Sequence, residues 1–338
     1  MKKSFQLAVS LGLTLVVGYL IYRGVPDWRQ AWNVMIQGRP VFFLGGLCFV
    51  LLHMFLRSVR WGVLLAPVKA NISLKSLFSL TLIKYVVNVI PPRVGEVVAS
   101  VVLARKEDMP ATSVIAASIL ERVLDMLTVV IIFGVYLSFF SHRFLPTSEH
   151  GKHVMAMIQN YSIKGIIGLV VAFFLVRILL RNDRWMSRLP HRVRGLMQSF
   201  LDGFRGLQRG GVLSQAVVLS LLIWLAITLQ LWCMMLAYID NFPFLGALFL
   251  MALTVVGVAI PTPGGVGGFQ FFMSLALVNF FASYLSSSDP QSQAAGISNG
   301  SYLVSMVPVM LIGLFFLNRE GLSFKKVSQM AEQDRDKQ

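Results

Sequence analysis

The sequence predicts an all-α fold: a polytopic helical membrane protein built as an inverted-topology repeat. Hydrophobic residues make up 56% of its 338 residues, and charged residues only 13%. Because a soluble domain carries roughly 25% charged residues, this chain has too few charges to cover a water-facing surface. Long apolar runs recur along the chain, and two further apolar runs are broken by proline and glycine.

The long apolar runs are the predicted membrane-spanning helices. A helix needs about 20 predominantly apolar residues to cross the hydrocarbon core of a bilayer. The segments that meet this need are 5–22, 40–66, 110–140, 162–180, 212–238 and 297–318. The first follows Lys2 and Lys3 and contains no small-residue cleavage site, so it is interpreted as a retained helix rather than a signal peptide.

Residues 76–105 and 244–284 are predicted to be re-entrant hairpins. Proline removes a backbone donor and glycine weakens a helix, so each run should break at its centre. The tip residues are Pro91, Pro92 and Gly95 in the first run, and Pro261, Pro263, Gly264, Gly265, Gly267 and Gly268 in the second. Irregular backbone at membrane depth is tolerated only where protein or a wet cavity satisfies it. The two tips are therefore expected to cover each other near the bilayer midplane.

Two shorter segments, 27–37 and 193–207, place apolar residues on one helical face and polar residues on the other. This pattern is typical of helices that lie in the membrane interface. Trp28, Trp32, Met35 and Ile36 form the apolar side of the first segment.

Basic residues set the predicted orientation. The Arg-rich loop 181–209 and the tail after Leu317 should be cytoplasmic, whereas the Ser- and Gln-rich segment 285–296 should lie outside. Lys2 and Lys3 place the amino terminus inside too, although the basic segment 23–39 then falls outside. The protein is thus expected in the cytoplasmic (inner) membrane with both termini cytoplasmic.

With this orientation, each half of the chain is predicted to contain a helix, an interfacial helix, a helix, a broken hairpin and a helix, in that order. The two halves have opposite orientations in the membrane. The predicted divisions are a first membrane repeat (1–140), an outer connecting loop (141–161), a second membrane repeat (162–318) and a cytoplasmic polar tail (319–338). In inverted repeats of this kind the broken elements form the substrate site.

The net charge of +15 would favour nucleic-acid binding in a soluble protein. Here the basic residues lie mostly between apolar runs, which indicates topology and contact with anionic lipid head groups instead. No nucleic-acid partner, metal site or cofactor is expected. His142, His150 and His153 share one predicted loop and are interpreted as solvated.

Glu121, Arg122 and Asp125 lie deep within the predicted helix 110–140. Each charge at a helix centre costs about 2.5–3.5 kcal/mol on insertion scales, so three of them need partners or a wet cavity. The functional interpretation is a polar site for a head group or a proton. The alternative is an ion-pair network that locks helices together. Arg57, Arg60 and Trp61 are explained by snorkelling and anchoring near the cytoplasmic end of segment 40–66.

The hairpin tips supply the remaining candidate substrate-binding residues, which are Asn88, Arg93, Glu96 and Gln270. Arg93 suits a phosphate because its planar fork donates two hydrogen bonds, and the alternative is an ion pair with Glu96 or Asp125. Asn88 is expected to cap a broken helix end rather than contact substrate. Gln270 could supply an uncharged hydrogen bond at the second tip.

Three motifs together carry a family resemblance: NVIPPRVGE at 88–96, ERVLD at 121–125 and PTPGGVGG at 261–268. By these motifs the chain resembles the UPF0104 family, which includes the transmembrane flippase-like domain of lysylphosphatidylglycerol synthase. The family pattern often has Glu where this chain has Gln270, and Arg near Ala99 and Ser100. The soluble aminoacyl-transferring domain of the bifunctional members is not expected here.

The resemblance implies a lipid translocase or lipid-binding transporter, rather than an enzyme, acting on an amphiphile with an anionic or glycosylated head group. A lipid-modifying synthase is a possible partner. Two alternatives stay open: a membrane-embedded transferase with Glu121 or Asp125 as base, and a non-catalytic accessory subunit.

Overall fold

The computed structural model describes residues 22–88, 94–140, 211–260, 262–286 and 288–320, with isolated positions within 12–19 and 152–168. Every regular element in these residues is helical, which confirms the predicted fold class. The predictions for 162–180, 181–209, 193–207 and the tail beyond Glu320 lie outside the described residues. So does almost all of the first predicted crossing, 5–22, and so do tip residues 89–93 and 261.

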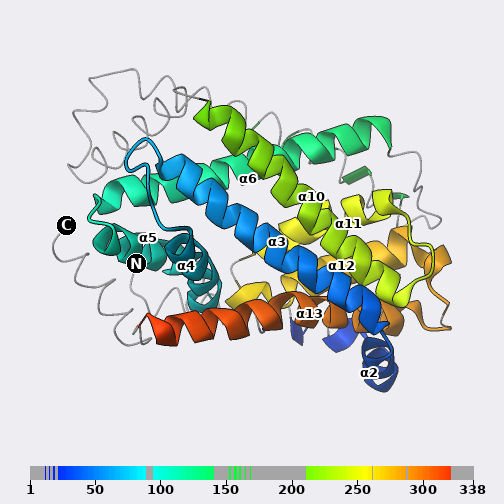
Figure 1. The fold of residues 1–338 in the computed structure, drawn as a ribbon. Helices are drawn as coiled ribbons and strands as arrows, with labels where there is room; N and C mark the ends of the chain where they lie inside the picture. Colours follow the sequence, from blue (N-terminus) through cyan, green and yellow to red (C-terminus); the bar gives the residue numbers. More distant parts are fainter. Residues whose placement is uncertain are drawn as a thin grey trace.

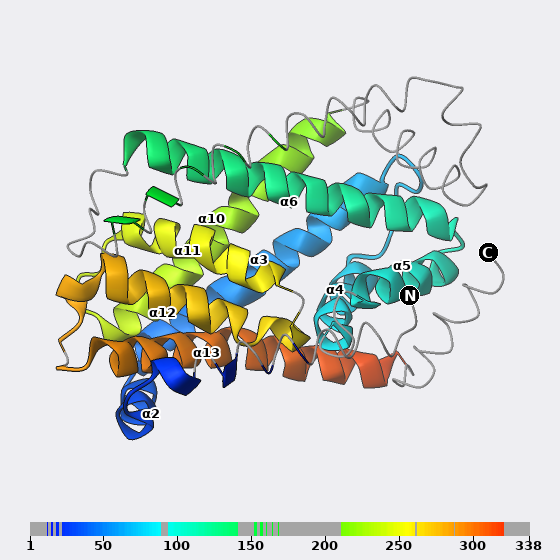
Figure 2. The ribbon, with the colours of Figure 1, turned by 180° about the vertical axis from the view of Figure 1, so that it is seen from behind.

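The longest helices run lengthwise through the molecule, and shorter helices cross this direction near both of its ends (Figures 1 and 2). In chain order they are α2 (Trp28–Ile36), α3 (Pro40–Leu65), α4 (Leu74–Val87), α5 (Val94–Lys106), α6 (Ala111–Phe139), α10 (Val212–Tyr238), α11 (Phe244–Ala259), η2 (Pro263–Gly265), α12 (Gly268–Phe280), η3 (Ala282–Tyr284) and α13 (Pro290–Arg319).

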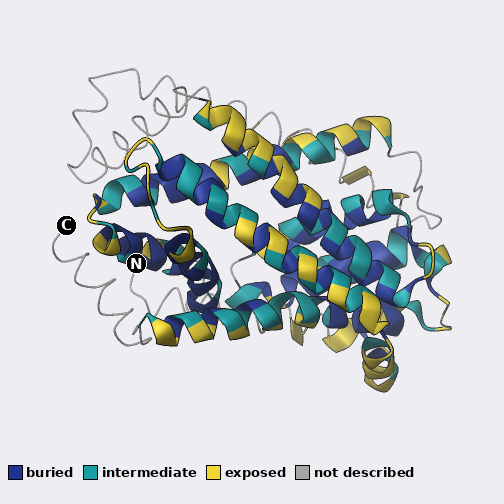
Figure 3. Ribbon diagram, viewed as in Figure 1, coloured by how far each residue is buried: buried dark blue, intermediate teal, exposed yellow. Residues whose placement is uncertain are grey.

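Three of the described helices, α3, α10 and α13, combine membrane-spanning length with a strongly apolar composition. The 29-residue α6 is long enough to cross as well, but its centre carries charges. Helices α3, α6 and α10 begin and end within one residue of the predicted segments 40–66, 110–140 and 212–238. Helix α3 packs along α10, and apolar side chains on their outer faces are exposed where lipid would lie (Figure 3).

The start of α13 differs from the prediction. Residues 285–296 were expected to form an outside loop, but the helix already begins at Pro290, capped by the Asp289 carboxylate. Its first turns are buried because small and polar side chains pack there against the chain before α2. The Asp27 N–H donates to Ser292 Oγ at 2.9 Å. The Ser- and Gln-rich composition therefore marks a buried polar helix face over 290–296, not a loop.

Both predicted hairpins are present as antiparallel helix pairs, α4 with α5 and α11 with α12. In the second pair, a Cβ placed on Gly257 would collide with the backbone of Gly268, and the reverse is also true. The backbones of α11 and α12 therefore touch, as only glycine permits. Helix α13 lies against α12 and, nearer its end, against α4, so it joins the two hairpins. The meeting of the two tips stays a prediction, since it depends on residues 89–93.

Polar contacts gather the helix ends into two groups. At one end, Lys69 pairs with Glu107 at 2.7 Å and Lys106 pairs with Glu320 at 2.8 Å. At the other end, Arg39 pairs with Asp240 at 2.5 Å. The amphipathic α2 lies at this second end, where the Tyr238 hydroxyl donates to the carbonyl of Met35 at 3.0 Å. As predicted for an interfacial helix, Trp28, Trp32 and Ile36 are exposed, whereas Met35 of the same predicted face is only partly exposed.

Candidate functional site

The charged residues of α6 point into the protein rather than into lipid. Glu121 and Asp125 are four residues apart and therefore share one face of the helix. Both are buried, and this face packs against α3 and α5. A buried carboxylate must be paired or hydrogen-bonded to stay ionised, so the neighbouring helices have to supply cations.

Asp125 receives two arginines from α3. Arg57 Nη1 lies 2.9 Å from Asp125 Oδ2, and Arg60 Nη1 lies 2.8 Å from Oδ1. Each carboxylate oxygen therefore lies beside its own guanidinium. The Arg60 side chain is 0% exposed and also donates to Ser220 Oγ of α10 at 2.8 Å. Asp125 thus ties α6 to α3, and Arg60 ties both to α10.

Glu121 pairs with a lysine from the first hairpin. Lys84 Nζ of α4 lies 3.2 Å from Glu121 Oε2, and Arg60 Nη2 lies 3.9 Å from Oε1. The Lys84 ammonium also sits 3.5 Å from the ring centroid of Trp61, a cation–π geometry. The buried lysine is therefore held by one carboxylate and one aromatic face.

Arg122 forms the accessible edge of the group. Its Nη2 lies 2.6 Å from Glu96 Oε1 of α5, and its Nη1 lies 3.5 Å from Asp125 Oδ2. The Arg122 side chain is 45% exposed, in contrast to the fully buried Arg60. A continuous chain of ion pairs therefore connects Arg122 at the surface with Arg60 in the interior through Asp125. We call these seven residues the charged cluster: Arg57, Arg60, Lys84, Glu96, Glu121, Arg122 and Asp125.

The charged cluster has more cations than anions. Its four basic side chains face three carboxylates, so the formal charge of these described residues is 4 − 3 = +1. Several buried polar atoms at its centre have no hydrogen-bond partner among the described residues: the donors Arg57 Nε, Arg60 Nε and the indole N–H of Trp61, and the acceptor Asp125 Oδ1. Among the described residues, the cluster therefore carries one positive charge that no carboxylate in it balances.

The snorkelling explanation for Arg57, Arg60 and Trp61 is wrong. Arg60 and Trp61 are fully buried, and both arginines pair with Asp125 instead of reaching an interface. One sequence signal could have identified these arginines and Lys84. Two buried carboxylates on α6 need cations within the membrane, and these three residues lie inside neighbouring apolar segments.

The first hairpin is closed by its predicted cap. Asn88 Oδ1, at the end of α4, accepts a hydrogen bond from the Gly95 N–H at 2.8 Å. This contact holds the start of α5 in place and so directs Glu96 towards Arg122. Arg93, Pro91 and Pro92 lie outside the described residues. The two carboxylates considered as partners for Arg93, Glu96 and Asp125, are both engaged with other arginines.

The second hairpin forms a separate hydrogen-bonded turn. Gly264, Gly265 and Gly267 have positive φ angles of 62°, 73° and 90°, which explains why glycine occurs there. The Gly267 N–H donates to Gln270 Oε1 at 2.7 Å, and the Tyr302 hydroxyl of α13 donates to the Gly264 carbonyl at 2.8 Å. Gln270 therefore makes an uncharged hydrogen bond at the tip, within its own hairpin. Pro263 begins η2, whereas Pro261 lies outside the described residues and Gly268 starts α12.

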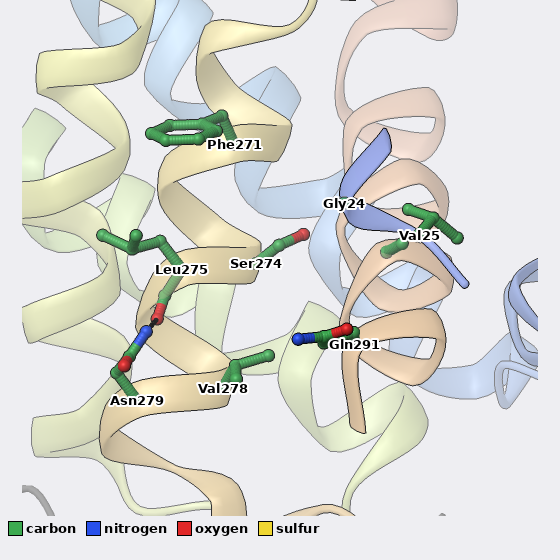
Figure 4. A pocket seen from close by; sticks show the side chains of 9 residues that line it. Gly24, Val25, Phe271, Ser274, Leu275, Val278, Asn279 and Gln291 are labelled. Atoms are coloured by element: carbon green, nitrogen blue, oxygen red, sulfur yellow. Dashed lines mark hydrogen bonds between the residues drawn. The ribbon is translucent and has the colours of Figure 1, made fainter. Parts of the chain in front are cut away.

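A shallow pocket of about 190 Å³ lies elsewhere, between α12, the first turns of α13 and Gly24 (Figure 4). Its walls are mainly apolar, with Ser274, Asn279 and Gln291 as the polar side chains. None of the described residues that line it is charged, in contrast to the charged cluster.

Comparison with protein families agrees with the motifs. A family model described as the lysylphosphatidylglycerol synthase TM region matches residues 5–313. No curated protein matches the chain. Because the match covers nearly the whole sequence and the described helices include apolar membrane-spanning ones, the chain belongs to the lysylphosphatidylglycerol synthase transmembrane-region family, whose members are integral membrane proteins related to lipid handling.

Proposed function

We propose that the protein is a lipid translocase that moves an amphiphile with an anionic head group across the cytoplasmic membrane. The observation that supports this most is the charged cluster, in which four buried or half-buried cations face three carboxylates. Charges inside a membrane protein are costly and typically mark a substrate or ion pathway.

The head group would enter at Arg122. This arginine is half-exposed and is held by Glu96 and Asp125, so an incoming phosphate competes for a guanidinium that is already positioned. Arginine suits this exchange because its fork can donate two parallel hydrogen bonds to a phosphate as well as to a carboxylate. The acyl chains would stay outside, along the exposed apolar faces of the helices.

Chemical catalysis fits the same residues less well. A transferase would need Glu121 or Asp125 as a free general base. In this structure Asp125 is paired with Arg57 and Arg60, and Glu121 is paired with Lys84. Either carboxylate would have to give up an ion pair before it could take a proton from a substrate. The same contacts suit a site that holds and exchanges an anion.

Purified protein reconstituted into liposomes tests the proposal. The probe is fluorescent phosphatidylglycerol, whose exposure in the outer leaflet is followed by chemical quenching, and lipids are analysed afterwards by mass spectrometry. Movement between leaflets without chemical change is the expected result. A new lipid product would instead identify a transferase, and neither movement nor product would favour an accessory subunit that acts with a separate synthase.

A further inference from the structure

A second polar network lies beside the charged cluster and links three spanning helices. His53 of α3 is buried, and its Nε2 lies 3.1 Å from Gln230 Oε1 of α10. Gln230 Nε2 donates in turn to Ser305 Oγ of α13 at 2.7 Å. Ser305 donates to the carbonyl of Ser301, also at 2.7 Å. The proposed translocation mechanism uses none of these side chains.

The hydrogen-bond directions along this network indicate which ring nitrogen of the neutral imidazole carries the hydrogen. Ser305 has a single hydrogen, which it gives to the Ser301 carbonyl, so it can only accept from Gln230. The amide nitrogen of Gln230 therefore faces Ser305, and its oxygen faces His53. It follows that His53 Nε2 carries a hydrogen and that Nδ1 of the neutral ring is bare. Among the described residues, this buried Nδ1 has no hydrogen-bond partner.

His53 is placed where its charge would act on the charged cluster. It lies four residues before Arg57 on α3, so the two side chains are neighbours on one helix face. The charged groups that face it are Arg57, whose charge opposes a proton on the ring, and, from α6, Asp125, whose charge favours one. Helices α10 and α13 face it with uncharged Gln230 and Ser305. From α4, the phenol of Tyr85 lies near Arg57 and interacts with it electrostatically.

We propose that Nδ1 of His53 binds a proton that is coupled to movement of the anionic lipid, an inference that rests on the proposed function. A proton on Nδ1 makes the imidazole cationic and raises the formal charge beside the head-group site from +1 to +2. An anionic head group then binds more tightly, and by linkage the bound anion favours the proton to the same extent. Proton and singly charged lipid move together as a neutral pair.

The test is lipid movement in liposomes under an imposed pH gradient, with fluorescent phosphatidylglycerol as the probe. Wild-type protein should accumulate the probe in the leaflet on the alkaline side, by up to about tenfold per pH unit, because one pH unit is a tenfold difference in proton concentration. Membrane voltage alone should not drive accumulation. In His53→Gln, which keeps an N–H donor for Gln230 but cannot gain a proton, the pH gradient should have no effect.

The matched control is His153→Gln, which removes an exposed imidazole far from the charged cluster in sequence. It should respond to the gradient as the wild type does. If the gradient fails to shift the probe in wild type, or shifts it equally in His53→Gln, proton coupling at His53 is wrong, while gradient-free movement would still support the translocase.

A second measurement tests proton binding at His53 independently of lipid movement. It therefore remains decisive even if no lipid moves, which would contradict the proposed function. Nitrogen NMR of histidine-labelled protein in nanodiscs reports the His53 ring, with His53→Gln providing the assignment. The ring should be neutral with hydrogen on Nε2 at alkaline pH. It should take up its proton at a higher pH in phosphatidylglycerol than in phosphatidylcholine, by more than His153 does. A His53 ring that stays neutral to pH 5 in both lipids would overturn the proposal.

Discussion

At the scale of single residues, each buried charge in the charged cluster depends on an oppositely charged partner for compensation. Removing one partner of a buried ion pair leaves the other charge uncompensated, which typically costs about 3–5 kcal/mol. Loss of the Asp125 carboxylate should have the largest effect, because it neutralises both Arg57 and Arg60. Exposed ion pairs, by contrast, contribute about 0–1 kcal/mol.

The substitution Asp125→Asn should therefore strongly destabilise the protein. Thermal unfolding in detergent, followed by tryptophan fluorescence, should show a clearly lowered Tm. The control is Asp240→Asn, which removes the carboxylate of the Arg39–Asp240 pair, where Asp240 is 82% exposed. That variant should unfold near the wild-type temperature. Equal Tm values for the two variants would show that Asp125 is not the buried anchor described here.

At the scale of elements, the two hairpins depend on close backbone contacts that proline and glycine permit. Helices α11 and α12 touch at Gly257 and Gly268, and the turn between them uses glycines with positive φ. The position of the breaks was predictable, since proline and glycine interrupt otherwise apolar runs. The sequence could not predict which glycines form the turn and which form the contact between the helices, because that depends on how the two helices approach each other.

Alanine at Gly257 should force α11 away from α12. Overpacking of this kind costs about 1–3 kcal/mol, and more where the clash is with backbone that cannot rotate away. Gly257→Ala should therefore lower Tm and reduce the yield of folded protein in detergent. Gly24→Ala is the control, since a Cβ there meets nothing within 4 Å. An unchanged Tm for Gly257→Ala would mean that the two helices do not touch at this point.

At the scale of the whole molecule, contacts assign the described segments to two ends as the threaded topology requires. Segments 66–73, 107–110 and the end of α13 share one end, whereas 37–39 and 239–243 share the other. The positive-inside rule predicts that the first end is cytoplasmic.

Cysteine labelling at Asn241 and Asp108 should establish that orientation. Both residues are exposed and have positive φ, 55° and 50°, so the two substitutions are matched for backbone strain. In a background without Cys48 and Cys233, a membrane-impermeant maleimide should label Asn241→Cys on intact cells. It should label Asp108→Cys only after permeabilisation. The opposite pattern would invert the topology.

Much of the helical fold could be predicted, because apolar length and charge asymmetry act locally along the chain. The ends of α3, α6 and α10 follow from composition alone. The first turns of α13 could not be predicted, because a buried helix face rich in Ser and Gln has the composition of a loop. Of the site residues, Glu121, Arg122 and Asp125 could be identified because placing charged side chains at the centre of a membrane helix costs free energy. Their partners Arg57, Arg60 and Lys84 required knowledge of which helices pack together.

The binding of an anionic lipid at the charged cluster is tested most directly by native mass spectrometry of lipid retained by the purified protein. Arg122→Gln removes the accessible cation, and Arg39→Gln is the matched control, because the two arginines are 45% and 44% exposed and each pairs with a carboxylate. Wild type and Arg39→Gln should retain an anionic lipid that Arg122→Gln loses. Equal retention by all three proteins, or retention of uncharged lipid alone, would contradict the assignment of the charged cluster as the head-group site.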